Sequence, residues 1–370
     1  MRSATLMLNW KCRSAVIVLC ISTYIPGSCY ALELPPITPV EEFFTIGSVP
    51  SVPDNWRLIV DGAVESPLSL TLDELMLRPA TTQMSTLECY FPIGPLLLIG
   101  NADWTGIPLN DIIDEARPLS GAVSITCVAL DRYSLGPYDL NEIRQRSDFL
   151  LAYGINGQLL PLEQGYPLKL VLPGIAGFQN VRWLERIEIK TLEPTLSLVH
   201  YPIHARIFEP SAREDVTLGR YTIRGMAYAG EGKEVTEVEV STDGGLTWHT
   251  ATLLNYFVPN VWKFWELKWK IPQVGDYQIF ARSVDNLGNV QRQEPGDFGW
   301  RGFGVSIHVD YGLDCPNYDG LNPVDFKDFS MFAGNLGVIG RGLTGDLNLD
   351  EVVDEKDLEI FAYYWLSDCY

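Results

Sequence analysis

The chain is short of positive charge. It has 27 lysines and arginines against 47 aspartates and glutamates, which gives a formal net charge of -20 at pH 7. A surface of that sign repels polyanions, so nucleic acid and anionic membranes are excluded as general partners. A local basic pocket for one anionic cofactor is still compatible with this charge. The sequence also lacks a Cys-x-x-Cys-His motif, so we predict no haem.

No apolar run near the start is long enough to span a bilayer comfortably. The run at residues 15–25 follows basic residues and precedes small residues that end at Ala31. We therefore predict a signal peptide over residues 1–31 and an exported protein, whether periplasmic, cell-surface or secreted. An uncleaved anchor is the alternative. The signal has no twin-arginine pair, because its two basic residues are split as Lys11-Cys12-Arg13.

Four of the seven cysteines remain if cleavage follows Ala31, namely Cys89, Cys127, Cys315 and Cys369. Cys315 and Cys369 bracket the last segment, and an oxidising compartment favours a disulfide between them. Cys89 and Cys127 then lie outside that bridge. A lone cysteine in an apolar strand is more often an inert packed thiol. The role of Cys89 therefore depends on the rest of the chain.

Three domains are predicted after the signal peptide. Residues 32–55 are rich in proline and acidic side chains and indicate an extended lead-in. Mixed strands and short helices follow, which indicates an α+β domain over residues 32–195. Strands are predicted at 57–64, 124–129, 168–172 and 183–189, and helices at 71–75 and 109–116. The first helix has Thr71 as its N-cap and Glu74 in a capping box.

Beyond Pro210 the helical pattern disappears. Aromatic, β-rich stretches are separated by Gly, Asp and Asn turns, and Asp243-Gly244 carries a hairpin signal. These stretches lie at 216–229, 234–240, 262–269 and 277–285. The pattern predicts an immunoglobulin-like β-sandwich over residues 205–310.

The final segment, residues 311–370, contains an internal repeat. Residues 324–333 return as residues 353–362, an offset of 353 - 324 = 29 residues. Two loop-helix copies predict a small helical module. In the second copy, oxygen ligands at positions 1, 3, 5, 9 and 12 of a loop suit calcium. These predicted ligands are Asp346, Asn348, Asp350, Asp354 and Asp357.

This loop resembles that of dockerin modules, in which Asp rather than Glu closes the site. The resemblance implies attachment to a cohesin-like scaffold. The usual glycine at position 6 is replaced by Glu351, and a solvated acidic turn is the alternative. The first copy, residues 317–328, places Leu321 at position 5, so we predict weak calcium binding there or none.

Two stretches of the α+β domain resemble a known family. Residues 85–89 end at Cys89, and an apolar loop and the segment Trp104-Thr105-Gly106-Ile107-Pro108-Leu109 follow. A longer match runs over residues 151–184 and includes Asn156-Gly157, Lys169 and Arg182-Trp183-Leu184. Both resemble the cofactor-binding domain of the sulfite oxidase family of molybdenum enzymes. The β-sandwich resembles the same family's dimerisation domain.

The resemblance implies roles for individual residues. Cys89 would bind the molybdenum of a molybdopterin cofactor, and Lys169 and Arg182 stand where the family binds the cofactor phosphate. Asp131 and Tyr133 resemble the Asp-x-Tyr motif beside the metal. The other implied cofactor-binding residues are Phe44, Gln164, Gln179, Asn180 and Val181. Taken singly, a surface charge or a turn aspartate is the alternative for each ionic residue.

The segment after Cys89 departs from the family. Animal and plant sulfite oxidases follow the metal cysteine with Ala-Gly-Asn-Arg, whereas Tyr90-Phe91-Pro92 stands here. No histidine falls in a cofactor motif; the four are His200, His204, His249 and His308. An apolar mouth lacks compensation for desolvating a dianion. We therefore predict a less charged sulfur compound, such as a sulfoxide, over sulfite.

The expected function is an exported molybdenum-molybdopterin oxidoreductase that transfers an oxygen atom or two electrons on a small substrate. A separate electron-transfer protein and a homodimer are the other expected partners. The alternative is a noncatalytic envelope protein that retains the fold without cofactor. The altered segment after Cys89 and the missing twin arginine are consistent with that alternative.

Overall fold

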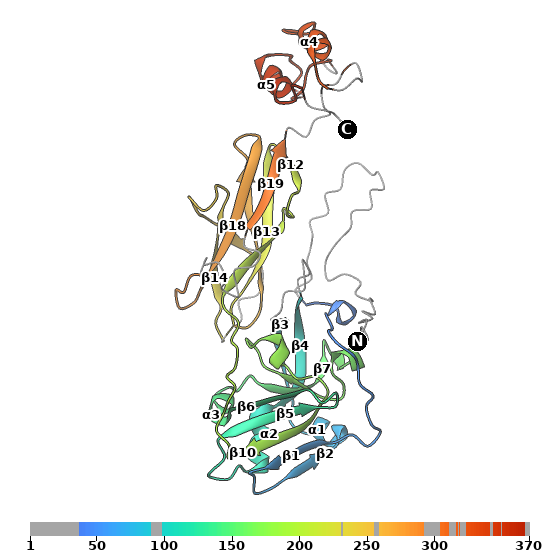
Figure 1. The fold of residues 1–370 in the computed structure, drawn as a ribbon, viewed down its shortest axis with the longest axis vertical. Helices are drawn as coiled ribbons and strands as arrows, with labels where there is room; N and C mark the ends of the chain where they lie inside the picture. Colours follow the sequence, from blue (N-terminus) through green and yellow to red (C-terminus); the bar gives the residue numbers. More distant parts are fainter. Residues whose placement is uncertain are drawn as a thin grey trace, which may run out of the picture.

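The structure is a computed structural model in which three bodies are stacked along the long axis of the molecule (Figure 1). It describes residues 37–89, 98–230, 232–254, 259–291, 304–310, 316, 318, 323–340, 343–348 and 350–366. The predicted signal peptide, the segment Tyr90–Pro92 and both cysteines of the predicted Cys315–Cys369 disulfide lie outside the described residues. Within the described residues, no helix is long and apolar enough to cross a membrane.

The first body contains two sheets. One has the strand order β2-β1-β10-β5-β6, and the other has the order β3-β4-β7-β8 with β9 paired to β7. The strands of the first sheet are β1 (Leu58–Gly62), β2 (Leu68–Leu70), β5 (Ser124–Ala129), β6 (Ser134–Asp139) and β10 (Leu184–Lys190). Those of the second are β3 (Thr81–Glu88), β4 (Ile99–Pro108), β7 (Leu150–Ile155), β8 (Gln158–Leu159) and β9 (Lys169–Val171).

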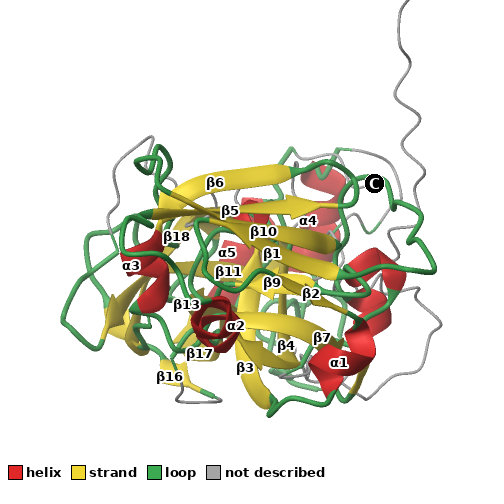
Figure 2. Ribbon diagram, turned by 90° about the horizontal axis from the view of Figure 1, so that it is seen from below, coloured by secondary structure: helices red, strands yellow, loops and turns green. Residues whose placement is uncertain are grey.

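Short helices complete this body. They are α1 (Leu72–Met76), α2 (Leu109–Ala116) and α3 (Leu140–Arg144), with 3-10 turns at Val40–Glu42, Leu162–Gln164 and Gly177–Gln179. Helix α2 contacts both β1 and β4 and is seen end-on in Figure 2. Its buried residues are spaced i, i+3, i+4 and i+7: Leu109, Ile112, Ile113 and Ala116. The prediction of this helix is confirmed, and so is the capping box of Thr71 and Glu74 in α1.

The lead-in is not the unpacked segment that the sequence predicted. Phe43 is buried, and its ring packs edge-on against Trp104 with 5.6 Å between ring centroids. Gly100 on β4 makes room for the ring, because a Cβ there would lie 2.6 Å from it. The Thr38 N–H also donates to the Asn101 carbonyl over 2.8 Å. One aromatic residue opposite one glycine therefore fixes a segment whose composition indicates a loop.

The second body is a β-sandwich. Its two sheets have the orders β11-β13-β17-β16 and β12-β19-β18-β14-β15. The strands are β11 (His204–Glu209), β12 (Asp215–Thr217), β13 (Arg220–Tyr228), β14 (Val235–Ser241), β15 (His249–Thr250), β16 (Thr252–Leu253), β17 (Lys263–Lys270), β18 (Gly275–Asp285) and β19 (Gly304–Asp310). The predicted hairpin is confirmed, since β14 and β15 pair antiparallel on either side of Asp243-Gly244.

The two bodies are joined through strand β3. The Thr86 N–H donates to the Asn260 carbonyl over 2.8 Å, and the Trp262 N–H donates to Thr86 Oγ1 over 2.9 Å. A cluster of buried apolar residues fills the junction; among its members are Ile99, Tyr201, Tyr228, Trp262 and Phe264. The end of β3 is therefore held by the sandwich as well as by its own sheet.

The third body confirms the repeat. Helices α4 (Phe326–Ala333) and α5 (Glu355–Tyr363) begin 29 residues apart, and each starts with the same aspartate capping box. Asp325 and Asp328 form the first box, and Asp354 and Asp357 form the second. Figure 1 shows the two helices together at the far end of the molecule from the α+β body.

Candidate functional site

Cys89 lies directly after strand β3, half-buried at the junction of the two large bodies. Its N–H donates to the Leu98 carbonyl over 2.8 Å, and its carbonyl accepts a hydrogen bond from Tyr201 Oη over 2.5 Å. A Cβ on Gly177 would lie 2.5 Å from the Glu88 carbonyl oxygen and 3.3 Å from Cys89 Cα. Only glycine permits this close approach, which brings the predicted 177–181 loop onto Cys89.

Cys127 is a contrasting thiol. It is 2% exposed on β5, and burial raises the pKa of its thiol to about 12. A thiol that stays protonated is a poor nucleophile and a poor metal ligand. Cys127 is therefore the inert packed cysteine, and Cys89 is the candidate for chemistry.

This contrast predicts selective labelling. In folded, cofactor-free protein at pH 8, iodoacetamide should modify Cys89 and leave Cys127 at least about tenfold less modified, because Cys127 is a negligible source of thiolate. Peptide mass spectrometry measures both sites, and labelling in denaturant provides the control. Equal labelling of the two residues in the folded protein would contradict the assignment.

Lys169 is a buried cation on β9. It is 1% exposed, and its Nζ lies 4.4 Å from the ring centroid of Trp104 and 6.0 Å from that of Phe43. In the part of the chain that the structure describes, no carboxylate lies within ion-pair distance of this amine. Burial lowers the pKa of Lys169 to about 7, and the nearby charge of Arg182 contributes. A bound anion would favour the charged form of such an amine.

Arg182 lies beside this amine. Its Nη1 donates to the Glu163 carbonyl over 2.8 Å, its Nη2 donates to the Ile46 carbonyl, and its guanidinium stacks on Trp183 at 4.1 Å. Burial lowers its pKa, against the opposing effect of Asp131. Lys169 and Arg182 are thus two neighbouring cations within a chain of net charge -20. The pair fits a phosphate group.

Other predicted cofactor residues are engaged within the fold. Gln164 Nε2 donates to the carbonyls of Phe43 and Phe44 over 3.1 and 3.4 Å, so Gln164 anchors the lead-in. Gln179 bonds to Tyr138 Oη, the Ser197 carbonyl and the Val199 N–H. Asn180 bonds to the Leu172 N–H and to the carbonyls of Ile175 and Ala176. The amide side chains of Gln179 and Asn180 are thus used within the fold, so a contact with the cofactor would come from the main chain of their loop, which ends with the buried Val181.

Asp131 and Tyr133 lie beside the same loop. The Tyr133 N–H donates to Asp131 Oδ1 over 2.9 Å, and Tyr133 Oη donates to the Phe178 carbonyl over 2.9 Å. Burial and the Asp131 charge raise the pKa of Tyr133. Since Phe178 follows Gly177, these contacts link the Asp-x-Tyr motif to the loop that approaches the main chain of Cys89.

The sequence reasoning missed three residues next to Cys89. Glu88 is 2% exposed, its Oε1 lies 2.5 Å from Arg206 Nη2, and its Oε2 lies 3.1 Å from His204 Nε2. Burial alone would raise the pKa of Glu88, but these two partners outweigh it and lower the pKa. His204 and Arg206 belong to the second body, so no local motif reveals them. The one available signal is a glutamate within a buried strand end.

Among the described residues, no group of three or more His, Cys, Asp or Glu side chains is placed to hold a metal. A metal bound at Cys89 would therefore find no further cluster of such ligands among the described residues, and a cofactor could supply them. One half-buried thiol, the buried amine of Lys169 near the partly buried Arg182, and a glycine-lined loop together fit a phosphate-bearing metal cofactor.

Comparisons with known proteins agree. Residues 46–196 match the oxidoreductase molybdopterin binding domain, and residues 195–307 match the Mo-co oxidoreductase dimerisation domain. Sulfite oxidase of Gallus gallus is 30% identical over 311 residues, which cover 69% of this chain and 68% of that protein. Mitochondrial sulfite oxidase of Homo sapiens is 31% identical over 311 residues and is covered to 57%.

A solved structure shares the fold. The sulfane dehydrogenase SoxCD from Paracoccus pantotrophus aligns with a TM-score of 0.62 and 23% identity, over 76% of this chain and 87% of that chain. The α+β body and the sandwich together are thus a molybdopterin-binding domain followed by a dimerisation domain. The chain belongs to the sulfite oxidase family of molybdopterin-dependent oxidoreductases.

Proposed function

We propose that the protein is an exported molybdenum enzyme that acts on a small sulfur compound. The buried Lys169, which has no carboxylate within ion-pair distance among the described residues, carries the cofactor part of this proposal, because a bound anion would favour its charged form. Lys169 and Arg182 would hold the cofactor phosphate, the main chain of 177–181 would face the pterin, and Cys89 would bind the metal. The cofactor would supply reversible two-electron and oxygen-atom chemistry.

Cofactor content tests this assignment. Protein purified from its own host should contain about one molybdenum per chain. Arg182→Ala should lower that content about tenfold or more, because it withdraws a charge-assisted contact from the phosphate. Arg186→Ala is the matched control, since Arg186 pairs with Asp61 on the exposed side of β10. Full molybdenum content in Arg182→Ala, or none in the unmodified protein, would refute the placement; the latter result would favour the noncatalytic alternative.

The substrate proposal depends on the segment after Cys89. The family arginine is replaced there by Tyr90-Phe91-Pro92, which leaves a dianion less well compensated. Sulfite and water yield sulfate, two protons and two electrons, whereas a sulfoxide consumes two protons and two electrons to give a sulfide and water. We propose that dimethyl sulfoxide reduction with a viologen dye exceeds sulfite oxidation with ferricyanide. The opposite order would reverse the assignment.

The proposed function also implies two protein partners. Since the sequence has no haem motif, electrons would pass to or from a separate electron-transfer protein. The match of residues 195–307 to a dimerisation domain supports a homodimer. Light scattering of the purified chain would measure its mass against the 41.5 kDa of one chain.

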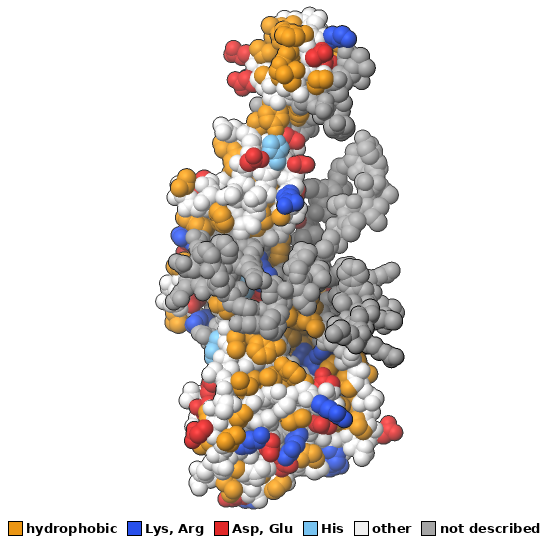
Figure 3. Space-filling model, viewed as in Figure 1, with side chains coloured by type: hydrophobic (Ala, Val, Ile, Leu, Met, Phe, Trp, Pro, Cys, Tyr) orange, Lys and Arg blue, Asp and Glu red, His pale blue; other side chains and the backbone are white. Residues whose placement is uncertain are grey.

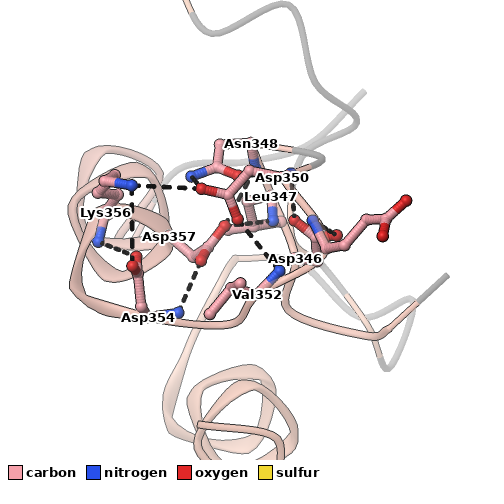
Figure 4. A network of polar contacts seen from close by, with 9 residues as sticks. Asp346, Leu347, Asn348, Asp350, Val352, Asp354, Lys356 and Asp357 are labelled. Carbon is pink, nitrogen blue, oxygen red and sulfur yellow. Dashed lines mark hydrogen bonds and ion pairs between the residues drawn. The ribbon is translucent and has the colours of Figure 1, made fainter. Parts of the chain in front are cut away.

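We propose that the C-terminal module binds calcium. Figure 4 shows the loop, in which the Asp357 carboxylate accepts hydrogen bonds from the N–H groups of Leu347, Asn348 and Asp354. Glu351, at the position usually occupied by glycine, has φ +69°. Its backbone therefore has the left-handed turn that such loops require.

The side chain of Lys356 pairs with two carboxylates of the acidic loop. Its Nζ lies 3.3 Å from Asp350 Oδ2 and 3.8 Å from Asp354 Oδ2. Calcium would replace this monovalent charge with a divalent one. In calorimetry of the full chain, calcium should raise the unfolding temperature of the module, and Asp346→Ala should remove that shift. Glu359→Gln, an exposed change on α5, should leave it intact; a shift that persists in Asp346→Ala would rule out this site.

Attachment to a cohesin-like scaffold is the remaining part of the proposal. The module exposes large apolar side chains, including Phe326 at 76% and Ile339 at 77% exposure, and Figure 3 shows hydrophobic side chains over its surface. Exposed apolar groups on so small a body favour a binding role.

A further inference from the structure

The second body reaches Cys89 through a charged group, here called the Glu88 cluster (Glu88, His204 and Arg206), in which Glu88 and His204 are buried and Arg206 is 28% exposed. The Glu88 side chain is 1% exposed, and that of His204 is 2% exposed. Glu88 Oε1 accepts a hydrogen bond from Arg206 Nη2 over 2.5 Å, and Glu88 Oε2 lies 3.1 Å from His204 Nε2 without a hydrogen bond between them. Both basic residues lie on β11, at the start of the sandwich.

The neighbouring main chain is held from the same direction. Tyr201, three residues before β11, donates its hydroxyl to the Cys89 carbonyl over 2.5 Å. Its ring lies 5.9 Å from that of His204 and 6.0 Å from that of Tyr228. On the other side, Gly177 leaves no room for movement toward its loop. Side-chain and main-chain contacts thus fix the Glu88-Cys89 peptide between the two bodies.

Burying the Glu88 carboxylate carries a large desolvation penalty. Two desolvated ions recover little net stability even when well paired, and an apolar replacement of similar volume is often as stable. The sandwich has no need of a charge pair to pack here, because an apolar cluster already fills the junction. What the cluster adds is direction, since Glu88 is bonded covalently to Cys89, its Oε1 accepts a hydrogen bond from Arg206, and its Oε2 contacts the His204 ring.

We propose that His204 and Arg206 are positioning residues that act through Glu88 to set the direction of the Cys89 thiol. The dimerisation domain would then shape the metal site without contributing a ligand to it. This inference builds on the proposed function, in which Cys89 binds molybdenum.

The test compares charged-cluster variants with a matched control. Arg206→Met and His204→Gln remove the two partners of Glu88. Arg224→Met removes another arginine–glutamate pair of the same sheet, 2.7 Å from Glu209 and away from Cys89. In molybdenum-loaded protein reduced by dithionite, the paramagnetic resonance of Mo(V) reports the ligand geometry. We expect shifted and broadened g values in Arg206→Met and His204→Gln at unchanged molybdenum content, partial recovery in Arg206→Lys, and the original spectrum in Arg224→Met.

Hydrogen exchange of cofactor-free protein separates this inference from the cofactor assignment. Arg206→Met should speed exchange of the Glu88 and Cys89 amides about tenfold, whereas Arg224→Met should not. If the unmodified protein contains no molybdenum, the proposed function fails, and exchange alone decides whether the cluster holds Cys89. Unchanged spectra in loaded variants, or unchanged exchange in cofactor-free ones, would overturn the inference. Where Arg206→Met does not fold, Arg206→Lys and His204→Gln supply the same comparison.

Discussion

Cys89→Ser should abolish turnover while leaving the protein folded. Serine is nearly isosteric, but its hydroxyl stays protonated and offers a hard oxygen where the metal requires a soft thiolate. We expect activity to fall at least about 1000-fold, which corresponds to about 4 kcal/mol. The main-chain contacts of Cys89 with Leu98 and Tyr201 do not involve the sulfur, so the fold is retained.

Cys127→Ser should instead lower stability and leave turnover unchanged. It places a hydroxyl in the core of the first body, where burial without a partner costs about 1–3 kcal/mol. The free energy of unfolding should therefore fall while the activity per molybdenum stays unchanged. Urea unfolding and steady-state assays measure the two effects. Normal turnover in Cys89→Ser, or lost turnover in a folded Cys127→Ser, would remove Cys89 from its assigned role.

Local patterns predicted local structure well. The helix at 109–116 has a complete apolar face, strand 124–129 is buried at every residue except Val128, and both were found at the predicted residues. The capping box of Thr71 and Glu74 is likewise a short-range signal. Such elements follow from contacts that span a few residues, which a sequence displays directly.

Long-range contacts were less visible. Phe43 packs against Trp104 and Gly100, about sixty residues away, so its burial cannot be inferred from a proline-rich segment. Family resemblance located Lys169 and Arg182, but not the rings that surround Lys169. It also gave no indication of His204, which lies outside the cofactor motifs and reaches Glu88 only through the docking of two bodies.

The sequence also could not predict the hydrogen-bond partners of three amide side chains, Gln164, Gln179 and Asn180. A polar residue in a cofactor motif can face the cofactor or can satisfy main-chain groups around it. Here the amides are used within the fold, because a tight loop leaves buried N–H and carbonyl groups that need partners. The motif thus located the loop correctly, although these amide contacts lie inside the fold.

Lys169→Met should make the cofactor-free protein more stable and unable to retain cofactor. The pKa of Lys169 falls from 10.5 to about 7 in the folded chain, so the folded state binds fewer protons than the unfolded state between these values. Protonating this buried amine therefore destabilises the folded state. The free energy of unfolding falls as the pH falls from 10.5 to 7, and this loss stays constant below pH 7. At pH 7, methionine should recover stability on the order of 4 kcal/mol, and the gain should vanish near pH 10.5.

Lys263→Met is the matched control, because Lys263 is equally buried but is paired. Its Nζ lies 2.9 Å from Glu234 Oε1 and 2.6 Å from the Val235 carbonyl. Removing it leaves those acceptors without their donor and should cost about 1–3 kcal/mol. Urea unfolding at pH 7 and pH 10 should therefore give changes of opposite sign for the two variants. Molybdenum analysis should show cofactor lost only in Lys169→Met, because a bound phosphate is what makes a charge at Lys169 favourable; a destabilised or fully loaded Lys169→Met would show that this lysine is structural.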